Sequence, residues 1–324
     1  MVASQNLWLH DILLRSFIKN GSSNINGSNS WELTDSQYLY LTPDMAKNFI
    51  EFTRNPLYRT QFFTLEVSMI YKVAKNIAKS IGDEPFNLVD IWCGDGLKAV
   101  ELIKSLNAIS VKPIKINYCP INASQYLIDL AISNVKKANL PNVVGYNSFI
   151  SSCDGRVLRD ISKKLRTKEF SKNVSLLLGG VIACYEINSY LFELSRDFKK
   201  GDVLIMGNGV RIGERLVEID KYKSKGFHDW LKHVMFSLDF SEKDIEFDAR
   251  FGNSRIELFY RLKKDYLQKL DGKNIQFKKG DEFVVASLYK YYAEEFDKFC
   301  SMYFAQTDVA TDKDNGYALV TCVK

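Results

Sequence analysis

The stretch Asn87–Leu106, NLVDIWCGDGLKAVELIKSL, decides the fold of this 324-residue chain. A buried apolar run ends at Asp90, and glycines then open onto a helix with apolar residues at helical spacing. A strand, a glycine turn and a helix in this order bring backbone N–H groups close to a bound ligand. Trp92 stands in this turn where such turns usually keep a glycine, and whether the turn still holds a cofactor decides the function.

The composition is that of a globular protein, with 46% hydrophobic and 26% charged residues. The formal charge of +5 comes from 44 basic and 39 acidic residues that are spread along the chain. A nucleic-acid footprint needs basic residues clustered on one face, so we expect no nucleic-acid partner. No apolar run approaches the length of a membrane span and no leader pattern is visible, which predicts a cytoplasmic protein without membrane contact.

The cysteines and histidines argue against a metal site. The six cysteines lie far apart without a C-x-x-C pair, which favours free thiols in a reducing compartment over disulfides or zinc. The three histidines, His10, His228 and His233, lack the spacing of metal ligands. We therefore predict no bound metal.

Short apolar strands alternate with helices from Phe86 onward. The predicted strands are NLVDIW, KINYCPI, NVVGYNSF, SLLLGGVIACY and DVLIMGN. This alternation predicts a doubly wound, mostly parallel α/β sheet with ligands at the carboxyl ends of its strands. After Gly213 a helical stretch, GERLVEIDKYKSKGFHDWLKHVMFSL, leads to two period-2 strands, SRIELFYRLKK and KNIQFKKGDEFVVAS. A helix, YKYYAEEFDKFCSMYF, and the strand YALVTCV are expected to return to the sheet as an antiparallel edge pair.

The region before the sheet is predicted to be helical with one polar interruption. Helices are expected at Leu7–Ile18, after Thr42 as N-cap, and at Phe63–Ile81 with an end at Gly82. The polar run NGSSNINGSNS is typical of a mobile loop.

The turn DIWCGDGLK narrows the class of ligand. The GxGxxG fingerprint of dinucleotide sites is absent, and so is the longer loop ending in Gly-Lys-Ser/Thr of a P-loop. An acid before the glycines, with a second strand further on, is typical of methyltransferases that use S-adenosylmethionine (SAM). A structural turn in another kind of α/β protein is the alternative that the motif alone leaves open.

Four further segments extend the pattern: LLLGGVIACYE, KGDVLIMGNGVRI, SRIELFYRLKK and IQFKKGDEFVVASLYKY. In order and spacing they resemble the histidine-specific SAM-dependent methyltransferase family, which includes the histidine Nα-methyltransferase of ergothioneine biosynthesis. The segment LTPDMAKNFIEFTRNPLYRTQFFTLE resembles the family's substrate entrance, so the resemblance runs from Leu41 to Cys322. It implies a Rossmann-like SAM-methyltransferase sheet with an inserted smaller α+β domain that holds an amino-acid substrate.

The resemblance divides the chain into four segments. Residues 1–85 are expected to form an N-terminal helical segment with the substrate entrance, and residues 86–212 the SAM-binding domain. Residues 213–287 are expected to form the substrate-binding insertion. Residues 288–324 then return as a helix and an edge strand that complete the SAM-binding domain.

The resemblance also implies which residues bind the cofactor. The positions that match the family's cofactor motifs are Asp90, Gly94, Gly96, Lys98, Gly179 and Gly180. Asp95 is expected to meet the amino group of the methionine moiety. Trp92 replaces the first glycine of the turn, Asn122 replaces a ribose-binding aspartate, and Asn147 replaces an aspartate that recognises adenine. An asparagine accepts such a hydrogen bond without the assistance of charge.

The expected substrate side departs from the family as well. His228 and Trp230 cover the family's asparagine segment, and Phe251 stands where a tyrosine hydroxyl is expected. Val285 stands where the family has its substrate-binding glutamate. Without that carboxylate a pocket no longer recognises a cationic imidazole, so we expect a substrate other than histidine, bound by Trp230, Phe251 and Val285.

The chemistry asks for few catalytic groups. SAM carries an activated methyl group, so the protein has to align an unprotonated amine with it and help remove a proton. The predicted catalytic residues are Tyr58 near the entrance, Ser287, and His228 as a base. Each has a structural alternative: Tyr58 packs, His228 is a surface or satisfied core histidine, and Ser287 caps the helix that Tyr289 begins.

Two functions therefore stay open. The first is a SAM-dependent methyltransferase that N-methylates a small amino-acid-like or amine substrate. The second is a catalytically degenerate relative that keeps the fold as a binding or regulatory partner of another protein. RNA methylation would need a basic face around the cleft, and no basic cluster demands one. Trp92 separates the two functions: an indole directed into the core leaves room for SAM, whereas one that fills the groove replaces it.

Overall fold

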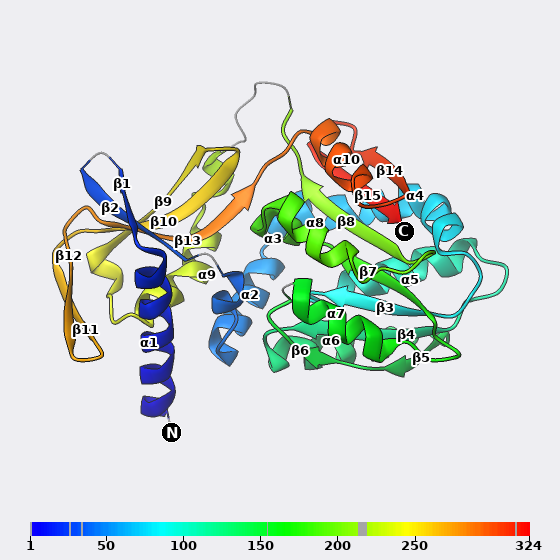
Figure 1. Ribbon diagram of the computed structural model, residues 1–324, viewed down its shortest axis with the longest axis horizontal. Coiled ribbons are helices and arrows are strands. Elements are labelled where there is room, and N and C mark those ends of the chain that lie inside the picture. Colours follow the sequence, from blue (N-terminus) through cyan, green and yellow to red (C-terminus); the bar gives the residue numbers. More distant parts are fainter. Residues whose placement is uncertain (1, 26, 34, 154, 213–218, 315) are drawn as a thin grey trace. The chain divides into compact units, whose positions relative to one another are not determined.

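The computed structural model of the protein (Figure 1) describes residues 2–324 except 26, 34, 154, 213–218 and 315. The chain folds into two compact units. Unit 1 comprises Met1–Phe52 and Leu216–Tyr289, and unit 2 comprises Thr53–Arg215 and Lys290–Lys324. The predicted helical stretch begins at Gly213, and its first six positions, 213–218, lie outside the described residues.

Unit 2 contains one large sheet. Its strands are β3 (Phe86–Ile91), β4 (Ile116–Asn122), β5 (Val143–Tyr146), β6 (Phe149–Ile150), β7 (Lys172–Leu177), β8 (Val203–Gly209), β14 (Gln306–Thr311) and β15 (Tyr317–Val323). The order is β14-β15-β8-β7-β3-β4-β5, and β6 pairs with β4. The strands from β8 to β5 run parallel, whereas β15 runs antiparallel to β8 and β14 antiparallel to β15. The parallel sheet and the antiparallel edge pair predicted from the sequence are thus confirmed.

Helices cover both faces of this sheet. They are α3 (Pro56–Tyr58), α4 (Leu65–Ile81), α5 (Leu97–Ile109), α6 (Gln125–Lys137), α7 (Gly155–Leu165), α8 (Ile187–Ser195) and α10 (Ala293–Ser301). Helix α5 packs between α4 and α6, and α7 packs against α8, which lies in front of the sheet in Figure 1. Two layers of helices around a parallel sheet are what right-handed crossovers produce.

Alternation along β3 divides its side chains between the two faces. Leu88 belongs to the main hydrophobic core together with Ile103 of α5. Val89 points to the other face, where it lines a small cavity with Leu158 of α7. Asp90 therefore shares the α5 face with Leu88.

Unit 1 contains a second sheet, with the order β1-β2-β13-β10-β9. Its strands are β1 (Ser22–Ile25), β2 (Ser28–Glu32), β9 (Ile245–Gly252), β10 (Arg255–Leu262) and β13 (Glu282–Tyr289), and a separate hairpin pairs β11 (Tyr266–Leu270) with β12 (Lys273–Phe277). The long helices that begin in this unit are α1 (Val2–Asn20), α2 (Pro43–Arg54) and α9 (Lys225–Phe236). Helix α1 packs its Phe17 edge-on against Phe283 of β13, with ring centroids 5.1 Å apart.

The structure corrects three expectations. The polar run predicted as a mobile loop forms the hairpin β1–β2, and β2 pairs in parallel with β13. This pairing, together with a hydrogen bond of 2.6 Å from Arg15 to Asp271, groups the first 52 residues with the insertion. The segment predicted as one strand, KNIQFKKGDEFVVAS, is divided into β12 and β13 by a turn in which Gly280 has φ +92°. The last helix begins at Ala293, so Ser287 lies inside β13 and does not cap it.

The start of α2 and the end of α4 lie where the sequence predicts them. The Thr42 hydroxyl accepts a hydrogen bond of 3.2 Å from the Met45 amide at the start of α2, as expected of an N-cap. Helix α4 ends at Gly82, which has φ +73°. None of the helices in the described parts of the chain combines the length and apolar character that crossing a membrane requires.

Candidate functional site

The carboxyl end of β3 turns sharply into α5. Trp92, Gly94 and Gly96 all have left-handed backbone conformations, with φ of 57°, 53° and 72°. A Cβ on Gly96 would lie 2.9 Å from Ala131 Cα, so only glycine lets α6 approach this closely. A tryptophan in the left-handed region carries a strain of about 1–3 kcal/mol. Trp92 is thus the non-glycine residue of this turn that is held in a strained, left-handed conformation.

Asp90 supports the turn from the α5 side of the sheet. Its side chain is buried, and its Oδ2 accepts a hydrogen bond of 2.7 Å from the Tyr118 hydroxyl. Burial raises the pKa of the Asp90 carboxyl to about 7, and the Tyr118 hydrogen bond only partly opposes this rise.

Asp90 makes the stability of the protein depend on pH. Because its folded-state pKa of about 7 lies above the ordinary 3.8, its contribution is complete below pH 3.8 and is lost as the pH rises through 7. Asp90→Asn should not lose this stability as the pH rises, because an amide does not ionise. Relative to the wild type, the variant should gain about 2–3 kcal/mol in the free energy of unfolding between about pH 5 and pH 8. Urea denaturation at both pH values measures the difference, and an unchanged difference would contradict the assignment.

The indole of Trp92 is directed toward the segment that follows β7. Its Nε1 donates a hydrogen bond of 2.8 Å to the Tyr185 hydroxyl, and the side chain is buried. Tyr185 in turn stacks on Tyr190 of α8, with ring centroids 4.2 Å apart. The Tyr190 hydroxyl donates to the Cys153 carbonyl at 3.1 Å. The indole is therefore a fixed part of the packing on the α8 side of the sheet.

A buried carboxylate organises the end of β7. Glu66 of α4 is fully inaccessible, and its two oxygens accept hydrogen bonds of 2.8 and 2.9 Å from the Gly179 amide. The same carboxylate accepts from the Tyr317 hydroxyl of β15 and pairs with the Lys98 ammonium of α5. Burial acts to lower the pKa of Lys98, but Glu66 together with Tyr58 and Asp95 outweighs it, and the pKa lies above its ordinary value. Glu66 thus connects the cofactor turn, the glycine pair and the edge strand.

Tyr58 shares the electrostatic environment of this ion pair. Burial raises the pKa of its phenol, the Lys98 ammonium opposes the rise, and the Glu66 and Asp95 carboxylates add to it. Tyr58 therefore stays protonated at neutral pH. A neutral phenol donates and accepts hydrogen bonds but is a weak base.

The remaining predicted cofactor residues line the same edge of the sheet or its continuation. The Asp95 carboxylate accepts a hydrogen bond of 3.1 Å from the Leu97 amide at the start of α5. Asn122 is 2% exposed, and its Oδ1 accepts from the Ser124 amide at 3.0 Å, where α6 begins. Asn147 is exposed between β5 and β6. The turn and the glycine pair are thus joined through Glu66, whereas the two asparagines follow β4 and β5.

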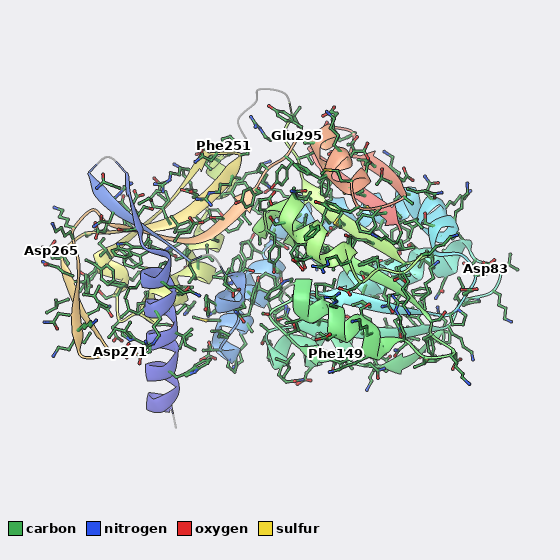
Figure 2. The ribbon with its side chains drawn as sticks, viewed as in Figure 1. Asp83, Phe149, Phe251, Asp265, Asp271 and Glu295 are labelled. Atoms are coloured by element: carbon green, nitrogen blue, oxygen red, sulfur yellow. The ribbon has the colours of Figure 1, made fainter. Side chains whose placement is uncertain are left out.

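The predicted substrate residues and two of the predicted catalytic residues belong to unit 1. Val285 is 1% exposed and occupies a bulge where β13 pairs with β10. Phe251 lies on β9, opposite Ile256 and near the β9–β10 hairpin (Figure 2). The Ser287 hydroxyl donates a hydrogen bond of 3.3 Å to Glu32 of β2.

His228 and Trp230 lie on α9 and are held by neighbours in unit 1. The two ring nitrogens of His228 lie 3.3 Å from Glu242 Oε1 and 3.2 Å from the Tyr260 hydroxyl. Trp230 stacks on Phe52 at a centroid distance of 5.2 Å. These contacts agree with the structural alternative for His228 and with packing for Trp230.

Glu66, Gly207 and Asn208 did not emerge from the sequence. Glu66 lies on the apolar stripe of α4 with Met69 and Ile70, and an acid on such a stripe is the signal that could have found it. Gly207 and Asn208 belong to a Gly-Asn-Gly run at the end of β8. Among the described residues, no group of three or more histidines, cysteines, aspartates and glutamates is arranged to hold a metal ion.

Solved structures of low similarity cover most of the chain. A SAM-dependent methyltransferase from Clostridium acetobutylicum is 12% identical, with 86% of this chain and 98% of its own covered and a TM-score of 0.44. The sugar N-methyltransferase KedS8 from Streptoalloteichus is 14% identical, with 86% and 92% covered and a TM-score of 0.40. The PH0226 protein from Pyrococcus horikoshii is 12% identical, with 87% and 100% covered and a TM-score of 0.43. No curated protein sequence is similar enough to count as a match.

A family model gives the decisive comparison. The model described as "Histidine-specific methyltransferase, SAM-dependent" matches residues 35–324. This match includes the whole sheet of unit 2 and strands β9 to β13 of unit 1. The cofactor of the family is SAM. The chain therefore belongs to the histidine-specific, SAM-dependent methyltransferase family.

Proposed function

We propose that the protein transfers a methyl group from SAM to the nitrogen of a small amino-acid-like or amine substrate other than histidine. The observation that carries this proposal is the Glu66–Lys98 pair, which joins the helix of the cofactor turn to the Gly179 amide. A buried ion pair with one partner at 0% exposure is costly unless its geometry is well satisfied. Its position at the carboxyl ends of β3 and β7, where parallel sheets bind ligands, supports a working site.

The residues of this edge fit a bound cofactor. Gly179 and Gly180 have φ of 84° and 73°, and a Cβ on Gly180 would meet only Asn208 Oδ1, at 3.9 Å, among the described residues outside its chain neighbours. A Cβ on Gly179 would lie 2.9 Å from Lys98 Nζ, so it is the backbone of Gly180 that is open to a ligand. We assign the backbone of Gly94 and Gly96 and this glycine pair to cofactor binding. When bound, SAM supplies the activated methyl group.

The predicted substrate-binding positions lack a carboxylate, and this bears on which methyl acceptor can bind. Val285 offers an isopropyl group where the family has a carboxylate, and the Ser287 hydroxyl already donates to Glu32. Neither side chain offers a negative charge to an imidazole, which disfavours histidine. Tyr58, protonated at neutral pH, is suited to orient the amine by a hydrogen bond rather than to act as a general base.

Calorimetric titration with SAM and with S-adenosylhomocysteine (SAH) tests the proposal. We expect dissociation constants on the order of micromolar, followed by methyl transfer to amines but not to L-histidine. Lys98→Met should weaken binding because it leaves the Glu66 carboxylate without its cation, whereas Lys164→Met on the exposed face of α7 should not. Absence of binding at millimolar cofactor would exclude the methyltransferase function.

A degenerate relative is the second candidate, because Trp92 stands where such turns usually keep a glycine. The burial of its indole on the α8 side of the sheet is instead what a turn that still admits SAM would show. The indole occupies the position of a glycine and is fixed by Tyr185. For this candidate the wild type does not bind SAH, and Trp92→Gly recovers binding. The same titration therefore separates the two functions.

A further inference from the structure

Helices α8 and α10 lie side by side in unit 2 (Figure 1). At their starts, the Ile187 amide donates a hydrogen bond of 3.3 Å to the Tyr291 hydroxyl. Beyond their ends, Phe198 packs edge-on against Phe304, with ring centroids 5.5 Å apart. Because start lies by start and end by end, the two helices run in the same direction. The exposed side chains of residues 186–200 and 294–303 form what we call the α8–α10 surface.

Opposite charges gather at the two ends of the α8–α10 surface. The acidic end is the first turn of α10, where Glu294 and Glu295 are exposed (Figure 2 labels Glu295). The basic end holds Lys298 in the last turn of α10, and Lys199 and Lys200 in the connection after α8. None of these five side chains has an ion-pair partner among the described residues. Neither end is therefore neutralised within that part of the chain.

An apolar patch belongs to the same surface. Phe192 in the middle of α8 is 48% exposed, and Met302, the C-cap of α10, is 65% exposed. Tyr303 connects the two helices: its ring lies 6.3 Å from that of Phe192, and its hydroxyl donates a hydrogen bond to Asn188 of α8. Aromatic and methionine side chains surrounded by charged ones are the composition of a protein–protein interface.

We propose that a second copy of this chain docks on the α8–α10 surface about a twofold axis perpendicular to it. Such an axis sets the helices of the two copies antiparallel, so each surface meets its own counterpart in reverse. The acidic end of each copy then faces the basic end of its partner, and the patch around Phe192 faces the same patch of the other copy. A parallel arrangement would put carboxylates against carboxylates, which costs free energy.

The presence of both charges on one surface selects this partner over a polyanion. Helix α10 has nine residues and is about 13 Å long, so a macromolecule that docks here contacts both ends. Nucleic acid or an acidic peptide attracted by Lys199 and Lys200 would be repelled by Glu294 and Glu295. A second copy of the same surface satisfies both ends at once.

Sedimentation velocity of the full chain, from about 1 to 200 µM, tests this proposal. In about 0.05 M salt we expect a monomer–dimer equilibrium with a dissociation constant on the order of micromolar. In about 0.5 M salt the dimer should weaken about tenfold or more, because salt screens exposed charges. A wild type that stays monomeric at both salt concentrations overturns the proposal.

Reversing the charge of one end gives the sharper test. Glu294→Lys with Glu295→Lys makes both ends basic, and Lys199→Glu with Lys200→Glu makes both ends acidic. Each double variant alone should dimerise about tenfold or more weakly than the wild type. A one-to-one mixture should restore dimers, because a basic surface then meets an acidic one, and this recovery also shows that both variants are folded. Mixing without recovery would contradict the antiparallel arrangement.

Two further variants separate the patch from the charges. Phe192→Ser should weaken the dimer about tenfold or more while its salt dependence stays the same. Lys75→Glu with Lys79→Glu, on the exposed face of α4, changes the net charge as much as the reversal of the basic end and should leave the dimer intact. Equal loss in this control would assign association to net charge and overturn the surface. Assemblies larger than dimers would exclude the twofold axis.

Discussion

Gly207→Ala is expected to lower the free energy of unfolding by about 3–5 kcal/mol, although it adds a single methyl group. A Cβ at this position of β8 would overlap Glu66 Oε1 and the Tyr317 hydroxyl. The backbone of Gly207 is not left-handed, so the cost does not come from a conformation reserved for glycine. It comes from displacing a buried carboxylate. If Glu66 moves, it loses the Gly179 amide and leaves the Lys98 ammonium without its counter-charge.

Urea denaturation of two further variants isolates this cause. Gly252→Ala on β9 is the matched control, because a Cβ there would meet nothing within 4 Å in the described part of the chain and should change stability little. In a Glu66→Ala background the overlap with the carboxylate disappears and only the overlap with the Tyr317 hydroxyl remains, so Gly207→Ala should then cost less than it does alone. Equal costs of Gly207→Ala in both backgrounds would show that Glu66 is not what the methyl group displaces.

The sequence predicts the sheet of unit 2 better than the sheet of unit 1. The parallel sheet of unit 2 follows from local patterns, since each strand is a short apolar run and each helix has its own periodicity. The pairing of β2 with β13 could not be predicted, because it joins distant segments and the polar hairpin has no apolar alternation. Gly280 gave too weak a signal to divide β12 from β13 within an otherwise periodic run.

The candidate site divides in a similar way. The glycine turn could be found from the order of strand, glycines and helix, and the pair Gly179–Gly180 from the family resemblance; both have the left-handed backbone that favours glycine. Glu66 and Asn208 could not, because the sequence does not state which polar side chains tertiary packing will bury. Trp92 was recognised as a departure, but the direction of its indole depends on Tyr185, 93 positions further along the chain.

Trp92→Ala should lower the free energy of unfolding by about 3–5 kcal/mol, because it removes a large buried side chain and its hydrogen bond to Tyr185. Trp92→Gly should cost about 1 kcal/mol less than Trp92→Ala. Glycine is normally the less stable of the two, and the order is reversed here because residue 92 has φ 57°. Trp8→Ala on α1, where the side chain is 53% exposed, is the control and should change stability little.

Denaturation and SAH titration of the same variants connect this packing to function. If the indole serves only to pack the turn against the Tyr185 segment, the wild type binds SAH and Trp92→Gly binds no more tightly. A gain of binding in Trp92→Gly alone would mean that the indole occupies cofactor space, and the degenerate function would follow. The free energies of unfolding of these variants report the packing and backbone conformation of the turn. Their SAH affinities report whether the turn leaves room for the cofactor. An order of Ala above Gly in stability would contradict the left-handed conformation itself, whatever the titration gives.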